Sequence, residues 1–240
     1  PSHPRGFASE ISRDRKIRSY EVETHWYRHR NREAPEGAPT PRCLGSFAED
    51  GELFLLLEDL LTRGYDRALH AASWTEIAAV LRWLAHFHAR FLGDPAEGLW
   101  PCGTYWHLAT RPDELANIEG TRLHRFASLL DARLRRGGFP TLVHGDAKLA
   151  NFLFGDDRSR VAAVDFQYVG RGAAMQDVAY FVGSCLSGAD CERREEELLA
   201  TYFAELRACL PPEVEVLTSS RFFPFRSGKA TCLRARSSVS

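Results

Sequence analysis

The stretch that decides the fold runs from Leu142 to Gln167 and reads LVHGDAKLANFLFGDDRSRVAAVDFQ. Apolar residues at 141–143 predict a short strand that ends in the tripeptide His144-Gly145-Asp146. Two more apolar runs, 152–154 and 161–164, flank a Gly-Asp-Asp turn and predict a β-hairpin. The stretch therefore predicts three short strands joined by polar turns.

Three oxygen-bearing side chains stand at the ends of these strands. Asp146 follows the first strand, Asn151 opens the second, and Asp165 ends the third. Any one of them alone would be ordinary turn chemistry. As an ordered set they should meet at one end of the hairpin, where carboxylate and amide oxygens suit Mg²⁺ better than zinc. That pattern fits phosphoryl transfer, in which one Asp orients a hydroxyl while an Asn and a second Asp hold the metal.

Working outward, the rest of the chain is mainly helical. Apolar residues at helical spacing predict a helix over Thr75–Leu92, which Gly93 ends. Cys43–Phe47 and Leu53–Leu57 predict a second antiparallel hairpin around Asp50-Gly51, and residues 94–120 read as irregular. The strands do not alternate regularly with helices, so we expect an α+β fold rather than a doubly wound sheet. Four further helices are predicted. The first is Ser12–Arg32, with Ile17, Tyr20, Thr24 and Tyr27 on one face, and the second is capped by Thr121 and carries the apolar stripe Leu123, Phe126, Leu130 and Leu134. The other two are Ala174–Leu186 and Arg193–Leu210.

Composition excludes several classes of protein. The chain has 240 residues, of which 44% are hydrophobic and 26% charged, as in a globular protein. A net charge of −1 gives no electrostatic case for binding nucleic acid, and no apolar run is long enough to cross a membrane. Six cysteines without a C-x-x-C pair indicate reduced thiols and a cytoplasmic location.

The set H-G-D-x-x-x-x-N followed by D-F-Q, carried by Asp146, Asn151 and Asp165, resembles the aminoglycoside phosphotransferase and choline kinase-like family, and within it the ecdysteroid-kinase-like branch. The resemblance implies a protein-kinase-like fold, ATP and Mg²⁺ as cofactors, and a small hydroxylated substrate. It also implies that Asp146 acts on the hydroxyl and that Asn151 and Asp165 hold the metal. By the same resemblance Lys148 meets the γ-phosphate and His144 supports the loop through hydrogen bonds.

The resemblance extends to other segments. Glu23 stands where the family has the glutamate that pairs with an ATP-binding lysine, and residues 55–60, LLLEDL, resemble the hinge between two lobes. The hinge residues Leu57, Glu58 and Asp59 would then contact the nucleotide. Asp177 resembles a residue that braces the catalytic loop. We expect a remnant of the N-terminal lobe at 1–60, a mostly helical C-terminal lobe at 61–215, and a disordered basic tail at 216–240.

The chain also departs from the family. It has no glycine-rich phosphate loop, and the only lysine before Glu23 is Lys16, inside the predicted helix. The sequence therefore reads as a fragment that lacks most of the N-terminal lobe, and a truncated or pseudokinase-like protein that acts only by binding is the main alternative. A metal-dependent hydrolase using His144, Asp146 and Asp165 is a third interpretation. His88 lies on an apolar helix face and is expected to be a core histidine, and the sequence does not identify the acceptor.

Overall fold

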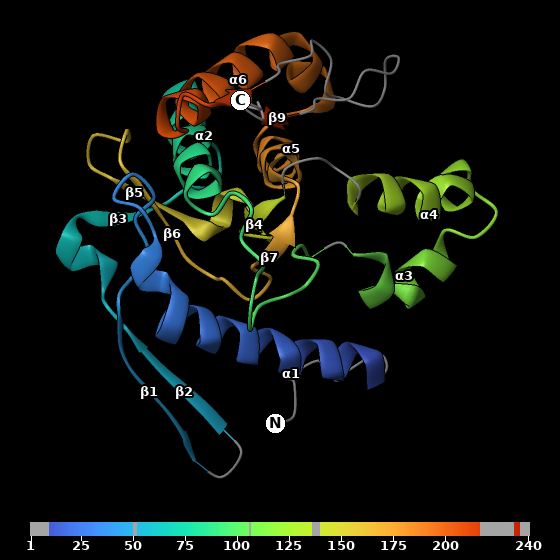
Figure 1. Ribbon diagram of the computed structural model, residues 1–240, viewed down its shortest axis with the longest axis horizontal. Coiled ribbons are helices and arrows are strands. Elements are labelled where there is room, and N and C mark those ends of the chain that lie inside the picture. Colours follow the sequence, from blue (N-terminus) through green and yellow to red (C-terminus); the bar gives the residue numbers. More distant parts are fainter. Residues whose placement is uncertain (1–9, 50–51, 106, 136–139, 217–232, 236–240) are drawn as a thin grey trace, which may run out of the picture.

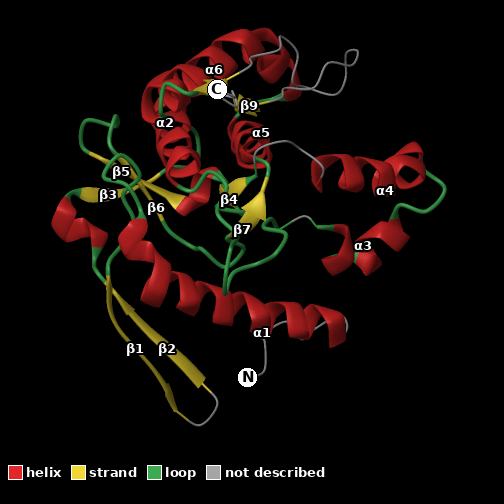
Figure 2. Ribbon diagram, in the orientation of Figure 1, coloured by secondary structure: helices red, strands yellow, loops and turns green. Residues whose placement is uncertain are grey.

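The computed structural model describes residues 10–49, 52–105, 107–135, 140–216 and 233–235. Helices dominate and surround several very small sheets (Figure 2). Three helices gather at one end, a long N-terminal helix crosses the opposite side, and a two-stranded hairpin projects from it (Figure 1). The helices are α1 (Glu10–His25), α2 (Trp74–Arg90), α3 (Pro112–Asn117), α4 (Arg122–Arg135), α5 (Ala174–Cys185) and α6 (Gly188–Cys209). The strands are β1 (Cys43–Glu49), β2 (Glu52–Leu57), β3 (Tyr65–Ala68), β4 (Thr141–Val143), β5 (Phe152–Gly155), β6 (Val161–Ala163), β7 (Gly170–Gly172), β8 (Val214–Val216) and β9 (Leu233–Ala235).

Both predicted hairpins are confirmed. β1 pairs with β2, and β5 pairs with β6, each in antiparallel register. The sequence pattern missed two long-range pairings, in which β3 joins the free edge of β5 and β4 pairs with β7. These strands are only three or four residues long. Such short segments carry almost no periodicity, so their partners are decided by tertiary packing.

The residues that the spacing places on one face of this helix are not all buried. Ile17 and Tyr20 are 39% and 40% exposed, whereas Ser19, Val22 and Trp26 are fully buried. The helix begins at Glu10, before the predicted cap at Ser12, and after His25 it continues as a π-helical turn to Arg30 and a 3₁₀ turn to Glu33. The wider π turn, which the 3.6-residue period does not anticipate, brings both Trp26 and Tyr27 into the core.

The helix α2 forms the centre of the molecule, as its apolar spacing predicts. Ser73 caps it, and Glu76 at the third position completes a capping box with the Ser73 main chain. Trp83 and Phe87 on this helix stack on each other at 5.0 Å, and both meet Phe166 from the deciding stretch. The core thus joins α2 directly to the segment that carries Asp165, which is how the helical lobe positions the candidate site.

The region between α2 and β4 contains two corrections. Residues 94–120, predicted as irregular, include a 3₁₀ turn at Leu108–Thr110 and the short helix α3. The helix α4 forms as expected, but its apolar stripe is not buried: Leu123, Phe126, Leu130 and Leu134 are each more than two-fifths exposed. Spacing predicts that an apolar face exists, and only the tertiary structure decides whether it is covered.

At the C-terminal end, α5 and α6 match the predicted helices closely, although α6 begins at Gly188, earlier than the expected Arg193. β8 pairs antiparallel with β9, so Leu233–Ala235 of the predicted tail forms a strand, and residues 217–232 and 236–240 lie outside the described residues. The division of the chain at residues 60 and 215 stays a prediction. Within the described residues, no helix combines the length and the apolarity that crossing a bilayer requires.

Candidate active site

The loop between β4 and β5 presents three of the predicted site residues together. The Nζ atom of Lys148 lies 2.6 Å from the Oδ2 atom of Asp146, and the Nδ2 atom of Asn151 donates to the main-chain oxygen of Asp146 at 2.8 Å and to its carboxylate at 3.1 Å. Asp146 is only 4% exposed. Because Asn151 uses its amide N–H groups on Asp146, its side-chain oxygen is left to accept from or bind another group.

The charge of Lys148 is stabilised by this arrangement. Burial by itself would lower the pKa of Lys148, but the hydrogen bond to Asp146 and the charges of Asp146 and Asp165 raise it overall. Lys148 therefore stays protonated between two carboxylates. A cation in this position can neutralise negative charge that approaches Asp146.

The backbone conformation of Asp165 and the surroundings of its carboxylate are both unusual. Its backbone has a φ of 67°, a left-handed conformation that is uncommon for residues other than glycine. Its Oδ1 atom is buried and has no hydrogen-bond partner among the described residues. A buried carboxylate oxygen without a partner is costly, and a bound metal ion would satisfy it. Asp165 and the Asn151 oxygen thus fit a Mg²⁺ site completed by phosphate oxygens and water.

His144 supports the loop that carries Asp146 through hydrogen bonds, as the resemblance implies. Its Nε2 atom lies 3.0 Å from the main-chain oxygen of Val164, and its Nδ1 atom accepts from the main-chain N–H of Asp146 at 3.3 Å. The main-chain N–H of Val164 in turn donates to the main-chain oxygen of Asn151 at 3.0 Å, so the Asn151 side-chain oxygen is not used in this bond. Since both ring nitrogens of His144 are engaged, it is not available as a metal ligand, which argues against the hydrolase interpretation.

Asp177 braces this loop from α5. Its carboxylate accepts from the main-chain N–H groups of His144 at 2.6 Å and Gly145 at 3.0 Å, and its Oδ2 atom lies 3.1 Å from His88 Nε2. The other ring nitrogen of His88 lies 2.9 Å from the hydroxyl of Tyr202. His88 is therefore a satisfied core histidine, and the resemblance assigned Asp177 correctly as a bracing residue.

Glu23 reaches the site from α1. Its carboxylate is largely buried, and burial together with the nearby charge of Asp165 raises its pKa to about 7, although hydrogen bonding to Gln167 and the charge of Lys16 work in the opposite direction. Lys16 donates to Gln167 at 2.8 Å across 151 positions of sequence. Sequence reasoning missed this role of Lys16, because no local pattern marks a contact between such distant residues.

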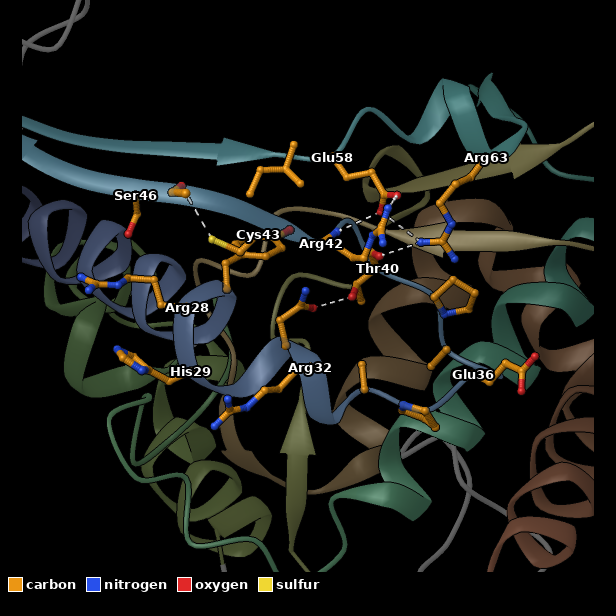
Figure 3. Close-up of a pocket in the computed structure, with 18 residues that line it drawn as sticks. Arg28, His29, Arg32, Glu36, Thr40, Arg42, Cys43, Ser46, Glu58 and Arg63 are labelled. Carbon is orange, nitrogen blue, oxygen red and sulfur yellow. Dashed lines mark hydrogen bonds and ion pairs between the residues drawn. The ribbon is translucent and has the colours of Figure 1, made fainter.

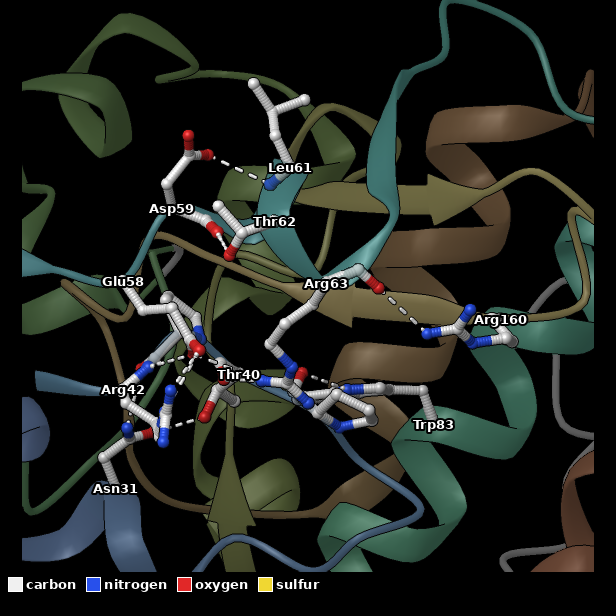
Figure 4. A network of polar contacts seen from close by, with 12 residues as sticks. Asn31, Thr40, Arg42, Glu58, Asp59, Leu61, Thr62, Arg63, Trp83 and Arg160 are labelled. Atoms are coloured by element: carbon white, nitrogen blue, oxygen red, sulfur yellow. Dashed lines mark hydrogen bonds and ion pairs between the residues drawn. The ribbon is translucent and has the colours of Figure 1, made fainter.

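Two of the predicted hinge residues, Glu58 and Asp59, lie in a different network (Figure 4), and Leu57 ends β2 opposite Cys43. The Glu58 carboxylate forms ion pairs with Arg42 at 2.7 Å and Arg63 at 3.3 Å, which lower its pKa against the effect of burial. Asp59 caps the 3₁₀ turn that follows by accepting from Leu61 N–H at 3.0 Å. In the part of the chain that the structure describes, no hydrogen bond or ion pair joins Glu58 or Asp59 to Asp146 or Asp165.

A cavity of about 1170 Å³ lies beside this network (Figure 3). Its walls come from the π and 3₁₀ turns that follow α1, the segment before β1, and β1 itself, and they include Arg28, Arg32 and Glu58. Neither Asp146 nor Asp165 lines it. The cavity therefore lies beside the hinge and apart from the candidate catalytic loop.

Aromatic side chains cover the other side of the catalytic loop. Trp100 stacks on Tyr168 at 6.3 Å, its indole N–H donates to the main-chain oxygen of Gln167 at 2.8 Å, and Tyr105 meets Tyr168 edge-on at 4.8 Å. Burial and the neighbouring Tyr105 raise the pKa of Tyr168 to about 12, so this phenol stays neutral. Trp100 and Tyr105 thus pack against the site, and the neighbouring Trp106 lies outside the described residues.

A mostly helical lobe that presents Asp146, Lys148 and Asn151 beside Asp165, with Glu23 on a separate helix, defines a protein of the protein-kinase-like fold. The chain belongs to the phosphotransferase enzyme family, whose model matches residues 8–215. This confirms the family and the fold predicted from the deciding stretch.

Solved structures agree on the fold. Aminoglycoside phosphotransferase APH(3'')-Id from Streptomyces rimosus, in complex with ADP and streptomycin, is 17% identical over 81% of this chain and 80% of that chain, with a TM-score of 0.55. A second structure of the same protein gives 17% identity, 82% and 80% coverage, and a TM-score of 0.52. A search of curated proteins found no match.

Proposed function

We propose that this protein transfers the γ-phosphoryl group of ATP to the hydroxyl of a small molecule, in the presence of Mg²⁺. The observation that carries the proposal is the unpartnered, buried Oδ1 atom of Asp165, set beside a carboxylate, a lysine and an asparagine that are already bonded to one another. Phosphoryl transfer requires little covalent chemistry from a protein, so positioning and charge carry most of the catalysis.

Each residue has a distinct role in this proposal. Asp146 accepts or orients the proton of the acceptor hydroxyl, and Lys148 neutralises charge on the transferring group. Asn151 and Asp165 hold Mg²⁺, which when bound supplies positive charge against the β- and γ-phosphates. Glu23 lies beside Asp165 and would therefore lie on the side of the site where the phosphates of the nucleotide bind.

Nucleotide recognition falls to the hinge. The main-chain N–H of Glu58 donates to the Arg42 oxygen at 2.8 Å, so this group is not available to a nucleotide base. Main-chain groups of Leu57 and Asp59 are therefore the proposed contacts, with the Glu58 side chain holding the hinge in place. The similar fold of the Streptomyces rimosus phosphotransferase, whose structure is in complex with ADP, supports nucleotide binding.

The test is Asp165→Ala compared with Asp156→Ala. Asp156 is an exposed aspartate on the turn after β5, and among the described residues it forms an ion pair with Arg67 at the surface. Turnover is measured by ADP release with Mg-ATP and a panel of alcohols that includes aminoglycosides and choline. We expect Asp165→Ala to lower kcat by at least about 10²-fold, the scale for removing a key electrostatic group, and Asp156→Ala to leave it unchanged.

Binding and turnover are separated by a thermal-shift titration. If Mg-ATP raises the Tm of the wild-type chain but no acceptor in the panel is phosphorylated, the nucleotide site stands and the acceptor lies outside the panel. If millimolar Mg-ATP gives no shift, the non-enzymatic interpretation is favoured for this chain. An Asp165→Ala variant that turns over normally would refute the assignment of the site.

A further inference from the structure

Three side chains of α1 converge on the side-chain amide of Gln167. The Nζ atom of Lys16 donates to the Oε1 atom of Gln167 at 2.8 Å, and the Ser19 hydroxyl lies 3.5 Å from the same oxygen. Glu23, one turn further along the helix, lies near the same side-chain amide, and hydrogen bonding to Gln167 is one of the influences that lower its pKa. Positions 16, 19 and 23 are three and four residues apart, so they lie on one face of the helix, and that face meets the segment after Asp165.

A neutral amide suits both the cation and the carboxyl group that face it. A glutamine side chain has one oxygen that accepts and one nitrogen that donates, so it can accept from Lys16 while it donates to Glu23. A glutamate in its place could only accept, and it would set a second carboxylate against Glu23. The main chain at this position is also fixed, because the indole N–H of Trp100 donates to the main-chain oxygen of Gln167 at 2.8 Å.

The two ends of α1 are held by different forces. At its C-terminal end Trp26 stacks on Phe166 at 4.7 Å, and both rings are fully buried. Earlier in the helix, Ile17 and Tyr20 are 39% and 40% exposed, so little apolar area is removed from water there. Polar contacts then contribute much of the restraint on the first half of α1: Lys16 donates to Gln167, and the Arg18 guanidinium lies 3.4 Å from the main-chain oxygen of Gly98.

We propose that Gln167 is a positioning residue that fastens the first half of α1 to the metal-binding loop, and so keeps Glu23 beside Asp165. Without this tether, the Trp26 end stays in place while the first half of α1 moves away from the loop. The structural part of the proposal stands by itself, and its consequence for nucleotide binding rests on the proposed function.

The test compares Gln167→Glu with Gln176→Glu in the full chain. Gln176, the only other glutamine in the sequence, accepts from Ala173 N–H at 2.9 Å in a helix cap, which a glutamate serves equally well. Amide hydrogen exchange is measured in the absence of nucleotide. In Gln167→Glu we expect exchange at least about tenfold faster in residues 15–23, with residues 26–30 unchanged, the scale for losing a hydrogen bond to a charged group. Gln176→Glu should exchange like the wild type.

Two further variants separate the tether from general damage. Lys16→Met removes one contact of Gln167 and should loosen residues 15–23, whereas Arg13→Met, which removes an exposed cation from the same helix, should not. Exchanging the partners, with Glu23→Gln and Gln167→Glu together, restores a donor and an acceptor and should return protection to the wild-type level. Equal exchange in Gln167→Glu and Gln176→Glu, or no recovery in the double variant, would overturn the proposal.

Mg²⁺ dependence reports whether the tether serves the site. The concentration of Mg²⁺ that gives half-maximal ATP binding should rise at least about tenfold in Gln167→Glu, because Asp165 is no longer held beside Glu23, while binding in Gln176→Glu stays unchanged. A purely structural role would speed exchange without moving this midpoint, and that result would overturn the link to Asp165. If the wild type binds no Mg-ATP at all, the proposed function fails, and the exchange data still decide the tether.

Discussion

Replacing Asp177 by asparagine should destabilise the protein strongly, although the two side chains have nearly the same size. Asp177 is 2% exposed, and its carboxylate accepts from the main-chain N–H groups of His144 and Gly145 and from His88. An asparagine offers only one oxygen and turns an NH₂ group toward a buried donor. At least one main-chain N–H then loses its partner, whichever way the amide is oriented.

The size of the effect follows from these contacts. Leaving a buried donor unsatisfied costs about 1–3 kcal/mol, and hydrogen bonds to a charged group contribute about 1.5–3 kcal/mol each. With two main-chain donors and His88 affected, Asp177→Asn should lower the free energy of unfolding by about 3–5 kcal/mol, in the range for breaking a buried charged network. Tryptophan fluorescence during urea unfolding measures it.

The matched control is Asp156→Asn. The Asp156 side chain is 85% exposed and its ion pair with Arg67 lies at the surface, so the same chemical change there should cost no more than about 0.5 kcal/mol. The reasoning is refuted if Asp177→Asn loses less than about 1 kcal/mol, since the main-chain groups of the loop would then not depend on the carboxylate. Under conditions where the variant stays folded, the displaced loop should also lower turnover, because it carries Asp146.

Two further predictions concern a glycine and a helix cap. Gly145 has a φ of 83°, and an added Cβ would lie 2.1 Å from the Tyr168 oxygen, so Gly145→Ala should cost at least about 2 kcal/mol in urea unfolding. Gly183→Ala, where nothing lies within 4 Å of the added atom, should stabilise α5 by up to about 1 kcal/mol, and similar losses in both variants would contradict the account. Burial raises the pKa of Glu76, but hydrogen bonds at the cap and Arg158 lower it below 4.5 overall. The stabilising effect of the Glu76 charge is therefore present above pH 4.5 and lost as the pH falls further. Glu76→Gln should destabilise the protein by about 1–2 kcal/mol at pH 7 and by progressively less in acid. A constant difference in stability across pH would disprove the role of the charge.

The sequence by itself determined the local elements and the family. The spacing of Ile77, Val80, Leu81 and Leu84 required a buried helix, and the two Asp-Gly or Gly-Asp turns specified hairpins, because these signals act between near neighbours. The ordered set of Asp146, Asn151 and Asp165 indicated phosphoryl transfer, since hard oxygen ligands and an alcohol-activating carboxylate are what that chemistry requires.

The tertiary structure alone decided how distant segments meet. It buried Ser19 and Val22 of α1 and left Ile17 and Tyr20 partly exposed, and it left the apolar stripe of α4 exposed. It also joined Lys16 to Gln167 across 151 positions, and it showed Glu58 bound to arginines. Periodicity shows that a helix has an apolar face, and the residue type shows that a side chain carries charge. The partner of that face or charge is set by the packing of the whole chain, in which each contact competes with water and with every other possible partner.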